Sequence, residues 1–182
     1  MHQSFHLGKE NSMANATASP PHAASDSRIL AGKYLTFTLG AEEFGLQILK
    51  VREIIGYMDI TAVPRAPLDV RGVINLRGQV VPIVDMRARF EMPPVEVSDQ
   101  TCIIVVEVTA SRQRFHTGII VDKVCEVLDI DGEDIEPTPQ FDSNVDTSFI
   151  LGMGKIAGTV KILLDIDKVL HTQELEQLAE NK

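Results

Sequence analysis

The sequence has no tryptophan, only two tyrosines and two cysteines, and no apolar run of membrane-spanning length. Because a membrane-spanning helix needs about 20 consecutive apolar residues, we expect no direct membrane insertion. The N-terminus also lacks the apolar core of a signal peptide, so a cytoplasmic location is expected. The two cysteines, Cys102 and Cys125, lie in apolar segments without CxxC spacing, which predicts reduced, buried thiols.

Positive charge is scarce as well. The chain carries 26 acidic and 17 basic residues, for a net charge of −9, and has no block of Lys and Arg. Nucleic acids and anionic membranes attract cationic surfaces, so this balance disfavours both as partners. A small nucleic-acid-binding barrel normally combines a basic groove with exposed aromatic residues, and it is kept only as a distant alternative.

Enzyme motifs are also missing. The sequence contains no HExxH zinc motif, no Walker phosphate loop and no GxSxG elbow. The segment Gly152-Met153-Gly154-Lys155 lacks the GK[ST] ending and a following helix, so it is not expected to bind phosphate. We expect no catalytic residue, no metal and no cofactor. An enzymatic site assembled from residues distant in sequence is the alternative that stays open.

What is present divides into three parts. Residues 1–30 have almost no periodic apolar pattern, which predicts a disordered tail. Residues 31–170 carry the apolar pattern of a folded domain, and residues 166–182 are expected to form a C-terminal helix and tail. The apolar stripe of this helix consists of Ile166, Val169, Leu170, Leu175 and Leu178.

The second half of the folded part repeats the framework residues of the first. One set recurs at a constant offset, with Gly45 and Pro64 matching Gly118 and Pro137. A second set recurs at a slightly longer offset, with Gly72, Gly78 and Asp85 matching Gly152, Gly158 and Asp165. A repeat of glycine, proline and apolar framework predicts two similar modules packed together, at about 33–97 and 101–165. Exchange of strands between the two modules stays open.

Short segments in which apolar and polar residues alternate predict strands throughout the folded part. The expected strands are 33–39, 44–48, 73–76, 80–84, 102–108, 117–121, 124–130, 149–153 and 160–164. Pro67–Val70 is expected to form one helical turn. Many short strands with little helix predict an all-β pair of small barrels. Gly78, Gly152 and Gly158 are predicted turn residues, because glycine adopts positive φ without steric cost.

One segment is distinctive: Val70-Arg71-Gly72-Val73-Ile74-Asn75-Leu76-Arg77-Gly78-Gln79-Val80-Val81-Pro82-Ile83-Val84-Asp85. It resembles the CheW family of chemotaxis coupling proteins, whose hallmark is this N-L-R-G turn followed by V-P-I-V-D. Residues 44–54, 118–124 and 162–170 resemble further segments of that family in the same order. The resemblance runs from about Lys33 to Leu170.

The resemblance implies two SH3-like five-stranded barrels without catalysis. Members of the family bridge transmembrane chemoreceptors and the histidine kinase CheA, and they support kinase activation in receptor arrays at the membrane. The implied partners are the regulatory domain of CheA, the cytoplasmic hairpin tip of methyl-accepting chemoreceptors and further CheW copies in arrays. The pathway stays open, with flagellar motility, pilus motility and other outputs as alternatives.

The resemblance also assigns the receptor-facing positions. They are Val51, Glu53, Ile54, Gly72, Asn75, Arg77, Cys102 and Val127. Glu53 and Arg77 are charged residues in apolar stretches, and the planar guanidinium of Arg fits a carboxylate. We therefore expect these two side chains to pair across a receptor groove between the barrels. The alternative is that each is a solvated edge residue. For Gly72, a demand of backbone geometry is favoured over contact with a ligand.

Overall fold

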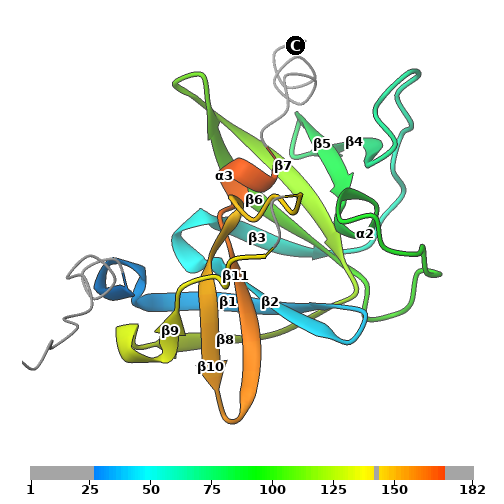
Figure 1. The fold of residues 1–182 in the computed structure, drawn as a ribbon. Coiled ribbons are helices and arrows are strands. Elements are labelled where there is room, and N and C mark those ends of the chain that lie inside the picture. The colour runs from blue at the N-terminus through cyan, green and yellow to red at the C-terminus, as the bar shows by residue number, and fades with distance from the viewer. Residues whose placement is uncertain (1–26, 142–143, 171–182) are drawn as a thin grey trace, which may run out of the picture.

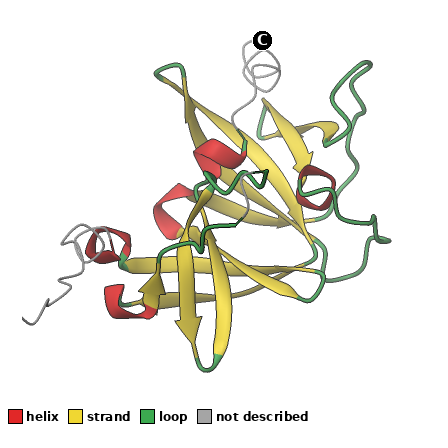
Figure 2. Ribbon diagram, viewed as in Figure 1, coloured by secondary structure: helices red, strands yellow, loops and turns green. Residues whose placement is uncertain are grey.

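The computed structural model describes residues 27–141 and 144–170, and most of its regular structure is β-strand (Figure 2). The strands are β1 (Gly32–Leu39), β2 (Glu42–Gln47), β3 (Val51–Gly56), β4 (Val70–Leu76), β5 (Gln79–Asp85), β6 (Cys102–Ala110), β7 (Gln113–Val121), β8 (Lys123–Ile130), β9 (Ile135–Glu136), β10 (Ile150–Ile156) and β11 (Thr159–Leu164). Short helical segments are η1 (Ile48–Lys50), α2 (Met86–Arg89), η2 (Gly132–Asp134) and α3 (Ile166–Val169). The predicted all-β class is confirmed.

The strands form two sheets that pack against each other (Figure 1). Sheet A has the order β8-β1-β2-β11-β10-β9, and sheet B has the order β3-β6-β7-β5-β4. Neighbouring strands are antiparallel except for the parallel pairs β2–β11 and β5–β7. Sheet A has six strands instead of the expected five because the two-residue β9 pairs with β10. In sheet B a single bridge between Thr61 and Val73 takes the corresponding place.

Each sheet combines strands from both sequence repeats. Sheet A joins β1 and β2 of the first repeat to β8–β11 of the second, and sheet B joins β3–β5 to β6 and β7. The chain therefore passes between the sheets at only two places among the described residues. The first crossing is η1, between β2 and β3, and the second is the single residue Asp122, between β7 and β8.

Apolar side chains fill three regions. The largest cluster joins the two sheets and includes Phe37 and Leu46 of sheet A with Ile104 and Ile119 of sheet B. One smaller cluster belongs to sheet B: Ile74, Val81, Ile83, Ile103 and Val105. Another belongs to sheet A: Tyr34, Ile130, Ile135 and Leu163. Because burial of apolar surface is the main favourable contribution to folding, the central cluster makes the two sheets one folding unit.

The repeated glycines Gly45 and Gly118 serve the two parallel pairings. Gly45 lies opposite Leu163, and Gly118 lies opposite Ile83. A Cβ atom at Gly45 would lie 2.8 Å from Leu163 Cδ2, and one at Gly118 would lie 2.4 Å from Ile83 Cδ1. Glycine at these positions therefore lets the exchanged strands approach each other.

Several local predictions need correction. Gly78 and Gly158 lie in the β4–β5 and β10–β11 turns with φ of 84° and 78°. Gly152 instead lies inside β10, where a Cβ atom would be 2.9 Å from the Glu136 carbonyl oxygen, so close strand contact and not a turn explains it. Residues 67–70 form a turn and no helix, with the Val70 amide donating to the Pro67 carbonyl at 3.0 Å.

The two ends of the folded part differ from expectation too. Residues 27–30, assigned to the tail, are helical, and the Leu30 carbonyl accepts a hydrogen bond from the Tyr34 hydroxyl at 2.7 Å. Leu30 also packs against the cluster of sheet A, which explains its order. At the other end, α3 covers only the start of the predicted C-terminal helix. The rest of the tail and of that helix, residues 1–26 and 171–182, lies outside the described residues.

Candidate functional site

The β4–β5 hairpin displays Arg77 at its tip. Arg77 and Gly78 form the turn with φ of 52° and 84°, and positive values at both central positions are typical of a tight type I′ hairpin. The side-chain oxygen of Asn75 accepts a hydrogen bond from the Gly78 amide at 2.9 Å. Asn75 therefore stabilises the turn, and the Arg77 side chain is left 78% exposed.

Glu53 lies on β3 and pairs with Arg77. The Arg77 Nη2 atom donates to Glu53 Oε2 at 2.7 Å, so the two side chains do pair. Both residues belong to sheet B, so the pair does not span the two sheets, and the expectation that it crosses a groove between the barrels is wrong. Strands β3 and β4 are the two edges of sheet B, and this ion pair joins them. Because exposed ion pairs usually add little stability, the main effect of the pair is to hold two charged groups in a defined position.

The other predicted positions on β3 and β6 are less polar than this ion pair. Ile54 follows Glu53 on β3, and it is 44% exposed. Val51 is half-buried and packs against the central cluster. Cys102 is half-buried at the start of β6 opposite Gly56, and its thiol donates to the Gln100 carbonyl at 3.2 Å. Ile54 is the exposed apolar residue of this set, but its side chain lies on the opposite face of β3 from that of Glu53. The cross-strand partners agree, because Ile54 pairs with Ile104 of the central cluster and Glu53 with Val105 of the sheet B cluster.

Gly72 acts through the backbone. It is buried in β4 with φ of 141°, at a register shift between β4 and β5. A Cβ atom here would lie 2.0 Å from the Thr61 carbonyl oxygen. Gly72 thus allows the loop that contains Thr61 to pack against β4.

Val127 lies apart from the other predicted positions, which all belong to sheet B and its hairpins. It is on β8 of sheet A, at the position that matches Ile54 in the sequence repeat. Ile54 and Val127 are 44% and 49% exposed. Val80 and Val160, which match each other at the longer repeat offset, are similarly exposed at 49% and 52%. The two sheets therefore present similar apolar positions, and sequence reasoning missed the second pair although the repeat relates them.

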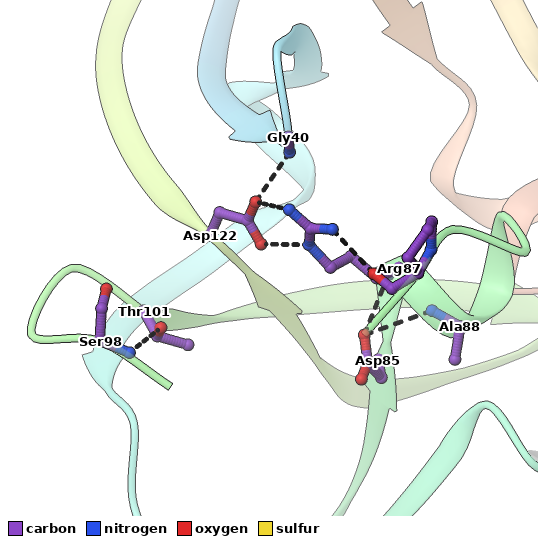
Figure 3. Close-up of polar contacts among 8 residues, drawn as sticks. Gly40, Asp85, Arg87, Ala88, Ser98, Thr101 and Asp122 are labelled. Carbon is purple, nitrogen blue, oxygen red and sulfur yellow. Dashed lines mark hydrogen bonds and ion pairs between the residues drawn. The ribbon is translucent and has the colours of Figure 1, made fainter. Parts of the chain in front are cut away.

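The aspartate of the V-P-I-V-D segment has a structural role. Asp85 Oδ1 accepts a hydrogen bond from the Arg87 amide at 2.9 Å and caps α2 (Figure 3). Its other oxygen accepts from Nε and Nη2 of Arg71 at 3.0 and 2.8 Å. Sequence reasoning missed α2, which has only four residues, although an aspartate before a short segment is a helix-start signal.

The prediction of two buried cysteines is wrong. Both thiols are free, but Cys125 is exposed and Cys102 is half-buried. Cys125 lies on β8, an edge strand of sheet A, so its apolar neighbours in sequence do not cover it. Partial desolvation and, next, the carboxylate of Glu43 raise the pKa of the Cys125 thiol. A raised pKa leaves less of the reactive thiolate at neutral pH.

Two kinds of feature are absent from the part of the chain that the structure describes. In residues 27–141 and 144–170, no helix is both long and apolar enough to cross a membrane. In the same two ranges, no group of three or more His, Cys, Asp or Glu side chains is arranged to hold a metal ion.

Comparison with known proteins identifies the family. The model of the CheW-like domain matches residues 33–174. Chemotaxis protein CheW of Klebsiella aerogenes is 41% identical over 143 residues, which cover 79% of this chain and 84% of that protein. Chemotaxis protein CheW of Rhizobium meliloti is 40% identical over 142 residues, with 78% and 89% covered. The crystal structure of the scaffolding protein TtCheW from Thermoanaerobacter tengcongensis is 33% identical, with a TM-score of 0.69 and coverage of 79% of this chain and 95% of that chain. This chain therefore belongs to the CheW family of chemotaxis scaffold proteins.

Proposed function

We propose that this chain is a non-enzymatic adaptor that couples transmembrane chemoreceptors to the histidine kinase CheA and supports kinase activation in receptor arrays. The observation that carries the proposal is the Glu53–Arg77 ion pair, which joins the two edge strands of sheet B in a CheW-family chain and shares strand β3 with the exposed Ile54. The cytoplasmic hairpin tip of the receptor binds at this surface. Binding recruits the protein from the cytoplasm to receptor clusters at the membrane.

The chemistry of the surface suits a helical partner. A helix tip that docks on a protein needs apolar anchors and a few oriented polar groups. Ile54 supplies an exposed apolar anchor. A guanidinium has five N–H donors, and the pairing with Glu53 Oε2 uses one of those on Arg77. The remaining donors are free to bind a carboxylate or carbonyl of the receptor, while Glu53 keeps the guanidinium in place.

An adaptor must hold two partners at once, and the repeat provides a second surface. Val160 of sheet A is exposed at the position equivalent to Val80 of sheet B, and neither belongs to the receptor-facing set. We assign the regulatory domain of CheA to apolar strand surface of this kind, away from Arg77 and Val127. Docking of the kinase there leaves the Glu53–Arg77 ion pair accessible to the receptor.

The test is reconstitution of receptor cytoplasmic fragments with CheA and increasing amounts of this protein, with kinase autophosphorylation as the readout. We expect a dose-dependent gain in phosphorylation that Glu53→Ala and Arg77→Ala both reduce. Lys155→Ala is the matched control, since it removes another exposed ion pair, with Glu136 on sheet A. A flat response to the unaltered protein, with no binding to either partner, would overturn the proposal. The receptor fragments that respond also identify the pathway.

A further inference from the structure

Each of the two crossings between the sheets carries an ion pair. At η1, Lys50 Nζ donates to Asp167 Oδ2 of α3 at 2.7 Å. At the second crossing, Asp122 accepts from Nε and Nη2 of Arg87 at 2.8 and 2.6 Å (Figure 3). A guanidinium that binds both oxygens of a carboxylate fixes their relative orientation as well as their distance.

The helix residues of the two ion pairs match each other in the sequence repeat, but with their charges reversed. Arg87 is the second residue of α2, and Asp167 is the second residue of α3, at the matching position of the repeat. In each case the short helix follows an aspartate cap at the end of a strand, Asp85 or Asp165. The helix contributes the cation at one crossing and the anion at the other. The crossing residues themselves are not equivalent, since Lys50 matches Lys123 and Asp122 matches Leu49 in the repeat. The same helix position therefore reaches each crossing through a different partner.

Both carboxylates also bind a backbone amide of a hairpin. Asp122 accepts from the Gly40 amide in the β1–β2 turn at 2.7 Å, as Figure 3 shows. Asp167 accepts from the Thr109 amide near the end of β6 at 2.9 Å. Arg87 follows β5 of sheet B and reaches, through Asp122, a hairpin of sheet A. Asp167 follows β11 of sheet A and reaches β6 of sheet B directly. Each cluster therefore joins both sheets.

These contacts are directional, whereas the apolar cluster between the sheets is not. The side chains of Arg87 and Asp122 are only 12% and 24% exposed, and those of Lys50 and Asp167 are both 29% exposed. Partly buried, charge-assisted hydrogen bonds constrain angles, but apolar burial depends mainly on area. Arg89 adds a contact at the same interface, since its Nε donates to the Val169 carbonyl at the end of α3 at 2.8 Å.

We propose that Arg87 and Asp167 are positioning residues whose ion pairs at the two crossings fix the angle between sheets A and B. The angle in turn sets the distance between Arg77 on one sheet and Val127 on the other. The effect of this angle on receptor binding rests on the proposed function, but the angle itself does not.

The test measures the distance between the sheets directly. Cys102 and Cys125 are replaced by Ser, and Val80→Cys and Val160→Cys place one nitroxide label on each sheet at exposed positions. Pulsed electron paramagnetic resonance then gives the distribution of label distances. We expect a narrow distribution for the otherwise unaltered chain, and a broader or shifted one for Arg87→Ala and for Asp167→Asn. The double variant is expected to show the largest change.

The matched control is Arg71→Ala. It removes two guanidinium hydrogen bonds to Asp85, but both residues lie on strands of sheet B, so the distance between the sheets is expected to stay the same. Arg87→Lys keeps the charge and loses the two-pronged geometry, and we expect an intermediate distribution. If Arg87→Ala fails to fold, the distribution of label distances is measured in Arg87→Lys instead.

An unchanged distance distribution in folded Arg87→Lys, Arg87→Ala and Asp167→Asn would overturn the proposal. A residue that only adds stability lowers Tm and leaves the label distance of the folded protein unchanged, so that result also counts against it. The kinase assay tests the adaptor role separately from the distance measurement. If Glu53→Ala has no effect on phosphorylation while the distances change in the crossing variants, the positioning role holds and the adaptor role does not.

Discussion

Arg77 Nη2 lies 2.7 Å from Glu53 Oε2, and this contact joins the two edge strands of sheet B. The position of the guanidinium depends on the backbone, because Arg77 has a φ of 52° in a turn stabilised by Asn75. The sequence N-L-R-G therefore supplies both the charged group and the turn that orients it.

Glu53→Ala should lower the affinity for the receptor while leaving the free energy of unfolding almost unchanged. Arg77 is largely exposed, so loss of the ion pair is expected to change the free energy of unfolding by less than about 1 kcal/mol. Receptor affinity is expected to fall by about tenfold, since an unheld guanidinium must be ordered on binding. Urea unfolding and titration with a receptor fragment measure the two quantities, with Lys155→Ala as the control. Equal receptor affinity of Glu53→Ala and the unaltered chain would contradict the assignment of the site.

Gly72 and Gly78 both have positive φ, but they should respond differently to alanine. A Cβ atom at Gly72 would lie 2.0 Å from the Thr61 carbonyl oxygen, while one at Gly78 meets no atom within 4 Å. We expect Gly72→Ala to destabilise the fold by about 3 kcal/mol or more, because backbone must shift. Gly78→Ala is expected to cost about 1 kcal/mol from its φ alone. Similar losses in chemical denaturation would refute the steric explanation.

Thr117→Val should stabilise the protein. The Thr117 side chain is fully buried, and its hydroxyl has no hydrogen-bond partner among the described residues. Replacing an unsatisfied hydroxyl by a methyl group of similar size is expected to raise the free energy of unfolding by about 1 kcal/mol.

Thr36→Val is the control for this prediction. The Thr36 hydroxyl is equally buried, but it donates to the Glu126 carbonyl at 2.9 Å and accepts from the Glu126 amide at 3.2 Å. We expect this variant to be destabilised. Losses of equal size in the two valine variants would show that the Thr117 hydroxyl is satisfied in solution.

Asp122 should make the free energy of unfolding depend on pH. The hydrogen bonds from Arg87, followed by that from the Gly40 amide, hold the pKa of Asp122 below its ordinary value of 3.8. A lowered pKa in the folded state means that the ionised form stabilises the fold above the ordinary pKa, and that this contribution is lost as pH falls through the folded value. Urea unfolding of Asp122→Asn and the unaltered chain should differ by a constant amount near neutral pH, and the difference should shrink below about pH 4. A difference between the two proteins that stays constant below pH 4 would contradict the stabilising role of ionised Asp122.

Local sequence pattern predicted the parts of the fold that depend on near neighbours. The alternation of Leu35, Phe37 and Leu39 with polar residues placed β1 correctly. The half-buried strand that this alternation predicts is wrong, because Tyr34 and Thr36 on the other face are buried as well. The repeat predicted two similar modules. The Glu53–Arg77 pairing was predicted because two charged residues in apolar strands need a partner or solvent, although its role in receptor binding stays a prediction.

The rest depends on contacts between distant residues. Arg87 and Asp122 are 35 residues apart, and Lys50 and Asp167 are 117 residues apart, so no spacing rule relates them. The parallel pairing of β2 with β11 is likewise invisible in either strand alone. The exposure of Cys125 was missed because its apolar neighbours predict a buried strand, whereas the sheet order makes β8 an edge.

The exchange of strands sets an order of assembly during synthesis. Strands β1 and β2 are made before the other described strands, but Glu43 on β2 pairs with Lys161, 118 residues later. The hairpin of β1 and β2, which carries the fully buried Phe37 and Leu46, therefore lacks its flanking strands in sheet A until β8 and β11 have been made. Sheet B, whose strands lie between residues 51 and 121, can form before the hairpin of β1 and β2 has its flanking strands. Until then such a hairpin exposes apolar surface, which makes the incomplete chain prone to aggregation and a substrate for chaperones.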